Sequence, residues 1–168
     1  MKKLFFVAFA LVASASAFSQ SKDVVDIAIG SKDHTTLVAA VKAADLVTTL
    51  KSKGPFTVFA PTNAAFDKLP AGTVASLLKP ENKAQLAKIL TYHVVSGNLD
   101  ATAVIAAIKA GNGSAVLTTV SGGKLTGSIE NGKVKVTDEN GKSAFVTTAD
   151  LKGSNGVVHV IDGVVLPK

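Results

Sequence analysis

The sequence predicts an α+β fold, because helical patterns and strand patterns occupy different parts of the chain. Helical periodicity dominates up to about residue 110, whereas β-prone residues and turn signals dominate from Val116 onward. Strands and helices do not alternate regularly, which disfavours a doubly wound parallel sheet. No internal repeat, low-complexity tract or linker divides the chain, so we expect one domain.

The helices are predicted from apolar residues at helical spacing and from capping residues at their starts. Asp23 can cap a first short helix, and Asp45 can interrupt or restart a longer one. Thr62 and Asn63 can cap a short helix, since a polar side chain there bonds the free amides of the first turn. The predicted helical segments are residues 24–28, 36–50, 64–69, 73–78, 82–90 and 103–110.

The strands are predicted from runs of β-branched and aromatic residues bounded by turn residues. Residues 131–132 and 140–141 are both Asn-Gly, which is a strong two-residue hairpin signal. Val134 and Val136 lie between these turns and alternate with polar residues, as in a half-buried strand. The other predicted strand segments are residues 56–60, 92–95, 144–147 and 157–161.

The first 19 residues have the layout of a secretory signal peptide. Two lysines follow the initiator methionine, residues 4–13 are apolar, and mostly small residues lead to position 19. The apolar run is shorter than the about 20 residues that a transmembrane helix needs. We therefore expect cleavage after Ala17 or Ser19 and a secreted or periplasmic domain of residues 20–168. We expect no stable membrane insertion after cleavage.

Composition narrows the range of functions. The chain has no cysteine, so neither a disulfide nor a thiolate metal site holds the fold together. All 18 basic residues are lysines, against 12 acidic residues, and the lysines are scattered. Nucleic-acid binders cluster their basic residues and use the arginine fork, so nucleic acid is not an expected partner.

Catalytic and cofactor motifs are absent from the sequence. It has no nucleophile elbow, phosphate-binding loop, dinucleotide fingerprint or calcium loop. We interpret His34 as solvated in a polar loop, and His93 and His159 as core residues within apolar strands. We expect no cofactor, no metal and no enzymatic activity. A hydrolytic triad would have to combine Ser96 as nucleophile, His93 or His159 as base, and Asp100 or Asp162 as the orienting carboxylate.

Three segments together resemble the fasciclin-like domain, an adhesion module found in insect fasciclin, periostin, the keratoepithelin family and secreted bacterial proteins. They are residues 56–66, residues 90–95 and residues 155–167. The resemblance spans essentially the whole mature chain as one copy. It implies a compact α+β wedge, in which a β-sandwich of about seven strands carries several short helices along one side.

The resemblance also implies candidate binding residues. Animal members carry an Asp-Ile dipeptide implicated in integrin binding, and Asp150 and Leu151 hold that place here. The tyrosine–histidine block, also implicated in binding, matches at Tyr92 and His93. A structural role is the alternative for all four residues, with His93 hydrogen-bonded near the turn at residues 62–63. Thr62, Asn63 and His159 match positions that we expect to be structural.

The function implied by the resemblance is adhesion. We expect a non-enzymatic module that makes cell–cell, cell–surface, extracellular-matrix or biofilm contacts. Its partner would be a cell-surface or matrix protein or a polysaccharide, and the module would be a monomer or a weak oligomer. The alternative is a periplasmic carrier of a small hydrophobic ligand, since the aliphatic content permits a ligand pocket.

Overall fold

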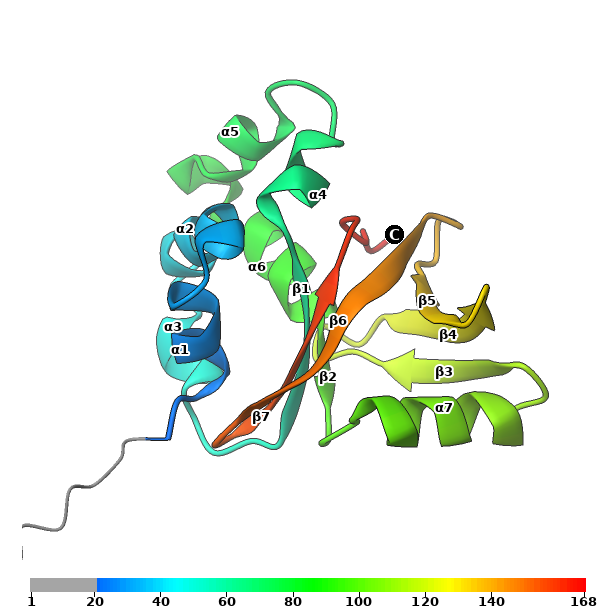
Figure 1. Ribbon diagram of the computed structural model, residues 1–168. Helices are drawn as coiled ribbons and strands as arrows, with labels where there is room; N and C mark the ends of the chain where they lie inside the picture. The colour runs from blue at the N-terminus through cyan, green and yellow to red at the C-terminus, as the bar shows by residue number, and fades with distance from the viewer. Residues whose placement is uncertain (1–20) are drawn as a thin grey trace, which may run out of the picture.

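The computed structural model describes residues 21–168, so the predicted signal peptide at residues 1–19 lies outside the described residues. Seven strands form one sheet in the order β2-β1-β7-β6-β5-β4-β3, with helices packed around it (Figure 1). The α+β class and the expected number of strands are confirmed. The strands are β1 (Phe56–Pro61), β2 (Val94–Ser96), β3 (Ser114–Thr118), β4 (Lys124–Glu130), β5 (Lys133–Thr137), β6 (Ser143–Gly153) and β7 (Gly156–Ile161).

The sheet curls until its two end strands almost meet. Val95 in β2 and Thr119 just after β3 form an isolated antiparallel bridge. The Val120 N–H also donates to the Val94 carbonyl over 2.7 Å. Strands β1 and β7 pair in parallel, whereas every other neighbouring pair is antiparallel. The result is a nearly closed sheet with an enclosed apolar interior.

The helices lie mainly on one side of the β1–β7 pair (Figure 1). Helix α7 is the exception, because it packs along β3 and β4. The helices are α1 (Val24–Ile29), α2 (Thr35–Ala43), α3 (Val47–Leu50), α4 (Asn63–Asp67), α5 (Thr73–Leu77), α6 (Lys83–Tyr92) and α7 (Ala101–Ala110), with two short 3₁₀ turns, η1 (Lys32–His34) and η2 (Pro80–Asn82). None of the helices in this part of the chain is long and apolar enough to cross a membrane.

The predicted caps start their helices. The Asp23 carboxylate accepts from the N–H groups of Val25 and Asp26, and the Asp26 side chain accepts from the Asp23 N–H in return. This capping box stabilises a helix of only six residues. The predicted helix at residues 36–50 is split as expected, because Asp45 adopts a left-handed conformation with φ of 56°. Helix α2 ends before it and α3 starts after it.

The prediction that residues 92–95 form a strand is wrong in its first half. Helix α6 continues to Tyr92, His93 is its C-cap, and only β2 is extended. The β-propensity of the aromatic and valine residues suggested a strand, but Leu86, Ile89, Leu90 and His93 share one buried helical face. The His93 ring bonds the carbonyl four residues earlier, which holds the last turn in helical form.

The predicted two-residue hairpin turn at residues 131–132 is confirmed, whereas the one at residues 140–141 is part of a longer loop, since β5 ends at Thr137 and β6 begins at Ser143. Asn131 and Gly132 have φ of 52° and 76°, which fits a tight turn between antiparallel strands. Gly141, with φ of 82°, lies in the turn between β5 and β6. These turns fix the register of the β4–β5–β6 ladder, which places Val136 in the core.

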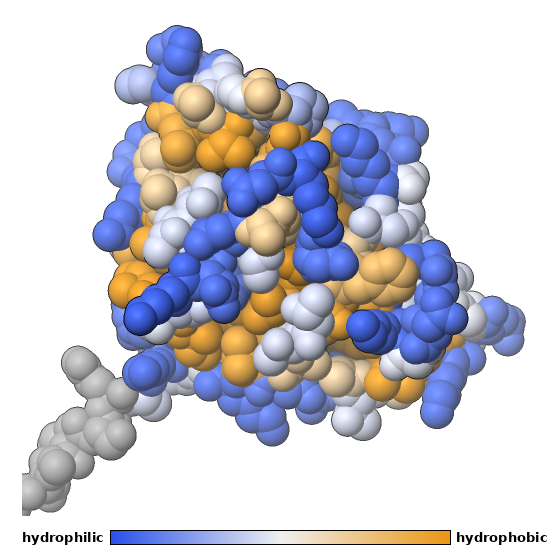
Figure 2. All heavy atoms as spheres, turned by 45° about the horizontal axis from the view of Figure 1, so that its top comes forward, coloured by the Kyte–Doolittle hydropathy of each residue, from blue (hydrophilic) through white to orange (hydrophobic). Residues whose placement is uncertain are grey.

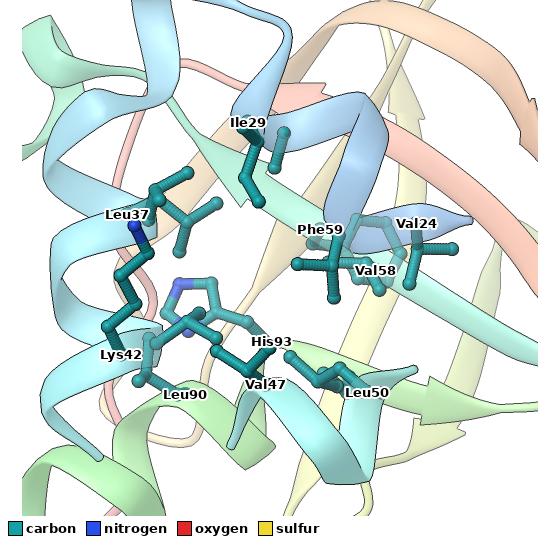
Figure 3. A pocket seen from close by; sticks show the side chains of 15 residues that line it. Val24, Ile29, Leu37, Lys42, Val47, Leu50, Val58, Phe59, Leu90 and His93 are labelled. Carbon is teal, nitrogen blue, oxygen red and sulfur yellow. The ribbon is translucent and has the colours of Figure 1, made fainter. Parts of the chain in front are cut away.

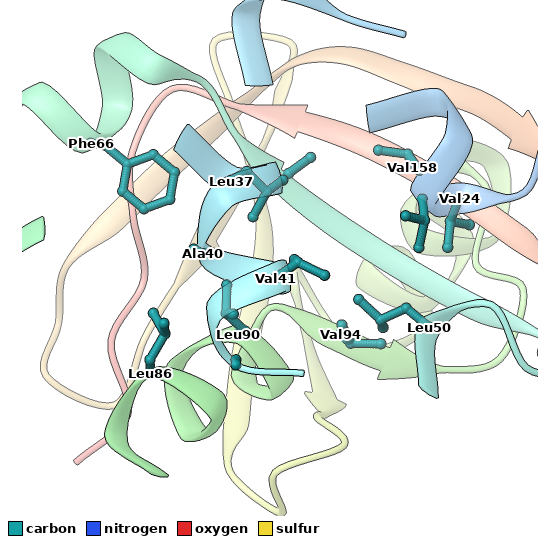
Figure 4. Packing of buried hydrophobic residues seen from close by; sticks show 13 residues of the cluster. Val24, Leu37, Ala40, Val41, Leu50, Phe66, Leu86, Leu90, Val94 and Val158 are labelled. Carbon is teal, nitrogen blue, oxygen red and sulfur yellow. The ribbon is translucent and has the colours of Figure 1, made fainter. Parts of the chain in front are cut away.

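The core has two main parts, separated by β1 and β7. One lies between the helices and the sheet, and includes Leu37, Val41, Leu90 and Val158 (Figure 4). The other fills the curled sheet around Phe59, together with buried residues of β4, β5 and β7. Successive residues of β1 therefore serve different clusters, as the pleat of a strand dictates.

Candidate functional site

Tyr92, one of the two residues of the tyrosine–histidine block, lies in the core. Its side chain is fully buried. The hydroxyl donates to the Lys124 carbonyl over 2.7 Å and accepts from the Glu139 N–H over 3.2 Å. Burial raises the pKa of Tyr92, so the phenol stays protonated and can donate. Tyr92 thus connects α6 to the β3–β4 turn region and to the end of β5.

His93 is also buried, between the helices and the C-terminal segment. Its Nδ1–H donates to the Ile89 carbonyl over 2.9 Å, and its Nε2 accepts from the Val165 N–H over 3.3 Å. These two partners require a neutral ring with the proton on Nδ1. Desolvation lowers the pKa of His93 to about 4, so the ring is neutral at neutral pH. The expected hydrogen bond near the turn at residues 62–63 is wrong, because Val165 holds that side of the ring.

His159 lies in β7, as predicted, and is likewise buried. Its Nε2–H donates to the Leu99 carbonyl over 2.7 Å, and its Nδ1 accepts from the Asp150 N–H over 3.3 Å. The imidazole ring also packs against Phe59, with 5.6 Å between ring centroids. His159 therefore joins β7, β6 and the segment that leads into α7.

Asp150 and Leu151 form part of a β-bulge in β6. The pairing of β6 with β7 shifts between Thr148 and Leu151, so two residues of β6 stand opposite His159. Asp150 has φ of 60°, a left-handed conformation that Asp tolerates better than most residues. The bulge takes the Asp150 N–H out of the strand ladder, and the His159 ring satisfies it.

The side chains of Asp150 and Leu151 point to different parts of the molecule. The Asp150 carboxylate accepts from the N–H of Ala101, the first residue of α7, over 2.7 Å. Leu151 packs against the cluster under the helices. Both side chains are half-buried. They do not form one exposed pair, and their part in binding a partner stays a prediction.

Thr62 and Asn63 have structural contacts. The Thr62 hydroxyl accepts from the Ala65 N–H, as predicted for a cap of α4. The Asn63 side chain reaches the preceding helical segment, where its Oδ1 accepts from the Thr36 N–H and its Nδ2 donates to the Lys32 carbonyl, both over 3.0 Å. Asn63 therefore fastens α4 to the start of α2.

His34 was expected to be solvated, and this is wrong, because its side chain is only 4 % exposed. Its Nδ1 is 2.8 Å from the Ser31 hydroxyl, while its Nε2 is buried without a hydrogen-bond partner. Burial lowers the pKa of His34, although the nearby Ala60 carbonyl and the Asp33 charge partly oppose that shift. Ser31 caps η1 and pairs with the His34 ring, but no local sequence pattern signals that the ring is buried.

The residues considered for a hydrolytic triad are not assembled. His93 and His159 hydrogen-bond to backbone groups, and neither hydrogen-bonds to a carboxylate. Asp100 caps α7 through the Ala103 N–H, and Asp162 accepts from the Phe145 N–H. In residues 21–168, no group of three or more His, Asp or Glu side chains could hold a metal ion.

An apolar cavity lies between helices α1–α3, α6 and strand β1 (Figure 3). Its volume is about 40 Å³. The His93 ring faces it from the end of α6, and Lys42 and Ile29 stand near its edge (Figure 3). Ile29 is half exposed, although it is a large aliphatic residue. The cavity is much smaller than the roughly 150 Å³ cavity that accommodates benzene in another protein.

The surface combines lysines with isolated apolar residues. Figure 2 shows hydrophobic atoms reaching the surface among hydrophilic ones on the face that it presents. On the outer side of the β3–β6 ladder, Val116 is 63 % exposed. It stands in a row with Thr126, Thr137 and Ser143, since these residues are paired across the four strands. This row on the outer face is rich in hydroxyl groups.

Comparison with known proteins identifies the family. The family model described as Fasciclin domain matches residues 32–167, most of the chain. The chain belongs to the fasciclin domain family. The resemblance inferred from the three segments is thereby confirmed, and helix α1 lies before the matched fasciclin range.

Several curated proteins are similar to this fasciclin domain chain. It is 51 % identical over 156 residues to protein sll1483 of Synechocystis, covering 93 % of this chain and 79 % of that protein. It is 38 % identical over 159 residues to immunogenic protein MPB70 of Mycobacterium bovis, with 91 % and 74 % covered. It is 39 % identical over 144 residues to the pig transforming growth factor-beta-induced protein ig-h3, with 86 % of this chain but 19 % of that protein covered.

A solved structure shares the fold. The FAS1 domain pair of the insect cell adhesion molecule fasciclin I superposes with a TM-score of 0.63 at 22 % identity. The match covers 77 % of this chain and 43 % of that one, as expected when one domain is compared with a pair. The α+β wedge implied by the fasciclin resemblance is therefore confirmed.

Proposed function

We propose that this fasciclin domain is an exported, non-enzymatic module that mediates adhesion to another cell, a surface or an extracellular matrix. The observation that carries the proposal is membership of the family over residues 32–167. Relatives of this fold include a cell adhesion molecule of insects. The signal-peptide layout of residues 1–19 supports export.

The arrangement of polar groups favours binding over catalysis. The side chains that the family motifs supply are used to hold backbone segments together, as Tyr92, His93 and His159 illustrate. A catalytic histidine needs one ring nitrogen free to exchange a proton with substrate. The rings of His93 and His159 have both nitrogens engaged with the protein backbone.

The alternative, a carrier of a small hydrophobic ligand, has less support. The apolar cavity beside His93 has the right lining, but its volume of about 40 Å³ is sufficient for little more than a water molecule. A carrier would require α1 or α2 to move outward. Native mass spectrometry of gently purified protein distinguishes the two functions, since a carrier retains an extra mass.

Adhesion is tested by measuring binding of the purified exported protein to whole cells and to polysaccharide-coated surfaces. Saturable binding is expected. The outer face of the β3–β6 ladder is examined with Val116→Ser, which removes the most exposed large apolar side chain without touching the core. If the wild-type protein binds to no cell or surface, the adhesion proposal fails.

The role of Asp150 requires a matched control, because its carboxylate also holds α7. Asp150→Ala removes the bond to the Ala101 N–H, and Asp100→Ala removes the bond to the Ala103 N–H in the same helix turn. Both variants are compared at a temperature where melting curves show them folded. Loss of binding in Asp150→Ala alone assigns Asp150 to the adhesive site. Equal binding in both variants assigns Asp150 a structural role only.

A further inference from the structure

The dipeptide Asn-Gly occurs four times in the sequence, at residues 112–113, 131–132, 140–141 and 155–156. Two of these copies lie in the same tetrapeptide, Glu-Asn-Gly-Lys, at residues 130–133 and 139–142. Asparagine is a thermolabile residue, and a following glycine favours its deamidation because no side chain shields the glycine nitrogen. The four copies have different surroundings in the fold, so they differ in their readiness to react.

Deamidation joins the glycine nitrogen to the asparagine side chain. The glycine nitrogen attacks the asparagine Cγ, a new N–C bond forms, and the bond from Cγ to the side-chain nitrogen breaks. Ammonia leaves with the proton of the glycine N–H, and a cyclic imide remains. Water then opens the imide at either carbonyl, which gives aspartate or isoaspartate. The reaction consumes water and releases ammonia, without oxidation or reduction.

The copies at residues 112–113 and 155–156 are held by hydrogen bonds and packing. The Gly113 N–H donates to the Ile108 carbonyl over 2.9 Å at the end of α7. The Asn155 side chain makes three hydrogen bonds to backbone groups of distant segments. Gly156 lies between β1 and β6, so close that a Cβ on it would be 2.0 Å from the Phe56 oxygen. Ring closure at either copy has to break such contacts.

The copy at residues 140–141 is also held, although its asparagine is exposed. The Gly141 N–H donates to the Asp138 carbonyl over 3.1 Å. The Asn140 Nδ2 donates to the Leu166 carbonyl over 2.9 Å, which fixes the side chain against the C-terminal segment. Both reacting groups of this copy are therefore engaged.

The copy at residues 131–132 is free at both reacting groups. Asn131 and Gly132 are exposed in the two-residue turn that Glu130 and Lys133 close. No hydrogen bond joins the Gly132 N–H or the Asn131 side chain to another group within residues 21–168. A Cβ on Gly132 would meet nothing within 4 Å, so the turn has room to change shape. Neither reacting group has to break a hydrogen bond before ring closure.

We propose that Asn131 is the principal deamidation site of the folded domain, where aspartate and isoaspartate accumulate with age. Isoaspartate adds a methylene to the backbone of a turn whose two residues both need positive φ. Either product also places a new carboxylate beside Glu130. The modification therefore loosens the β4–β5 hairpin and makes the protein more acidic. The inference is independent of adhesion, since the chemistry is measured on the isolated protein.

The test is incubation of the folded, purified exported protein at mildly alkaline pH, followed by peptide mapping with mass spectrometry. Cleavage after lysine places Asn131 and Asn140 in separate peptides, residues 125–133 and 136–142. Asn140 is the matched control, because its neighbours in the tetrapeptide are identical. We expect Asn131 to convert at least several-fold faster than Asn140, and faster than the other two copies. The rate should rise with pH, because the attacking nitrogen has to lose its proton.

The same incubation in denaturant shows whether the fold causes the difference. Asn131 and Asn140 are expected to react at similar rates there. The proposal is overturned if Asn131 reacts no faster than Asn140 in the folded protein, or if the same difference persists in denaturant.

An Asn131→Gln variant provides a second readout, because glutamine would have to form a larger ring and reacts much more slowly. The aged wild type is expected to develop a more acidic form on ion-exchange chromatography, and the aged variant at least several-fold less of it. Equal amounts of the acidic form in both proteins overturn the assignment to Asn131.

Discussion

The Nδ1 atom of His159 accepts a hydrogen bond from the Asp150 N–H, 3.3 Å away, at the bulge where β6 leaves its register with β7. The opposite nitrogen of the same ring donates to the Leu99 carbonyl. One buried side chain therefore compensates for the bulge and fixes the entry to α7. The conformation of the Asp150–Leu151 dipeptide depends on this ring.

Replacing His159 by Phe is expected to destabilise the domain by about 2 to 4 kcal/mol, because two buried backbone groups lose their partner. Urea unfolding monitored by circular dichroism measures the change. His34→Phe is the matched control, since only one of its two buried ring nitrogens has a partner, the Ser31 hydroxyl, and the expected loss of stability is about 1 kcal/mol or less. Equal stability of His159→Phe and the wild type contradicts the assigned role.

The buried His93 is expected to make the domain sensitive to mild acid. Its pKa is lowered to about 4 in the folded protein, whereas an unfolded histidine titrates near 6.5. The unfolded state thus binds the proton more readily, so stability is fully present above about pH 6.5 and falls as the pH drops toward 4. The loss amounts to roughly 3 kcal/mol over that range.

Measurement of the free energy of unfolding at constant ionic strength, from about pH 7.5 to about pH 4, tests this sensitivity, because that range brackets the two pKa values. A His93→Gln variant is the control. It is expected to be less stable at neutral pH and to have a flatter pH profile. An unchanged slope in the variant means that other groups cause the acid sensitivity.

Asn155 is expected to be a stability centre outside the family's tyrosine–histidine block. Its Nδ2 donates to the carbonyls of Leu50 and Ser52, and its Oδ1 accepts from the Val24 N–H. Asn155→Ala breaks all three bonds, so we expect a loss of about 2 to 4 kcal/mol. Faster hydrogen exchange should appear at the start of α1 and the end of α3.

Asn98→Ala is the matched control for Asn155, because Asn98 is exposed. Its stability is expected to lie within about 0.5 kcal/mol of the wild type. Protection factors in α1 that are identical in Asn155→Ala and the wild type would show that α1 is held by its apolar face alone.

Tyr92→Phe separates a structural role of the tyrosine from a binding role. The variant keeps the buried ring but leaves the Lys124 carbonyl and the Glu139 N–H without a partner. We expect a loss of about 1 to 3 kcal/mol in stability and no change in adhesion at a temperature where the protein is folded. If the folded variant adheres more weakly than the wild type, Tyr92 takes part in binding.

The sequence predicted most helix starts, because local chemistry determines them. Asp23 and Thr62 cap their helices through groups two or three residues away, which can be read along the chain. The hairpin glycines are equally local. Tyr92 and His93 were misplaced because β-propensity and helical periodicity disagreed there, and packing of α6 on the sheet decided for the helix.

The candidate site was harder to predict, because it depends on contacts between distant segments. The burial of His34 results from packing of η1 near Ala60 in β1, and no local pattern indicates it. The bulge at Asp150 depends on the register of β6 with β7, which is set by hairpins elsewhere in the sheet. The sequence identified Asp150 as a candidate binding residue, but it could not show whether the side chain stabilises the fold or binds a partner.

Helix α1 has a practical consequence for how the domain is delimited. It precedes residue 32, where the family match starts, yet it contributes the buried Val24 and Val25 to the core. A recombinant fragment cut at the family boundary would lack one wall of the cavity near His93. Expression from Ser21 retains that wall, whereas a protease acting just after Gly30 would open the apolar cavity to solvent.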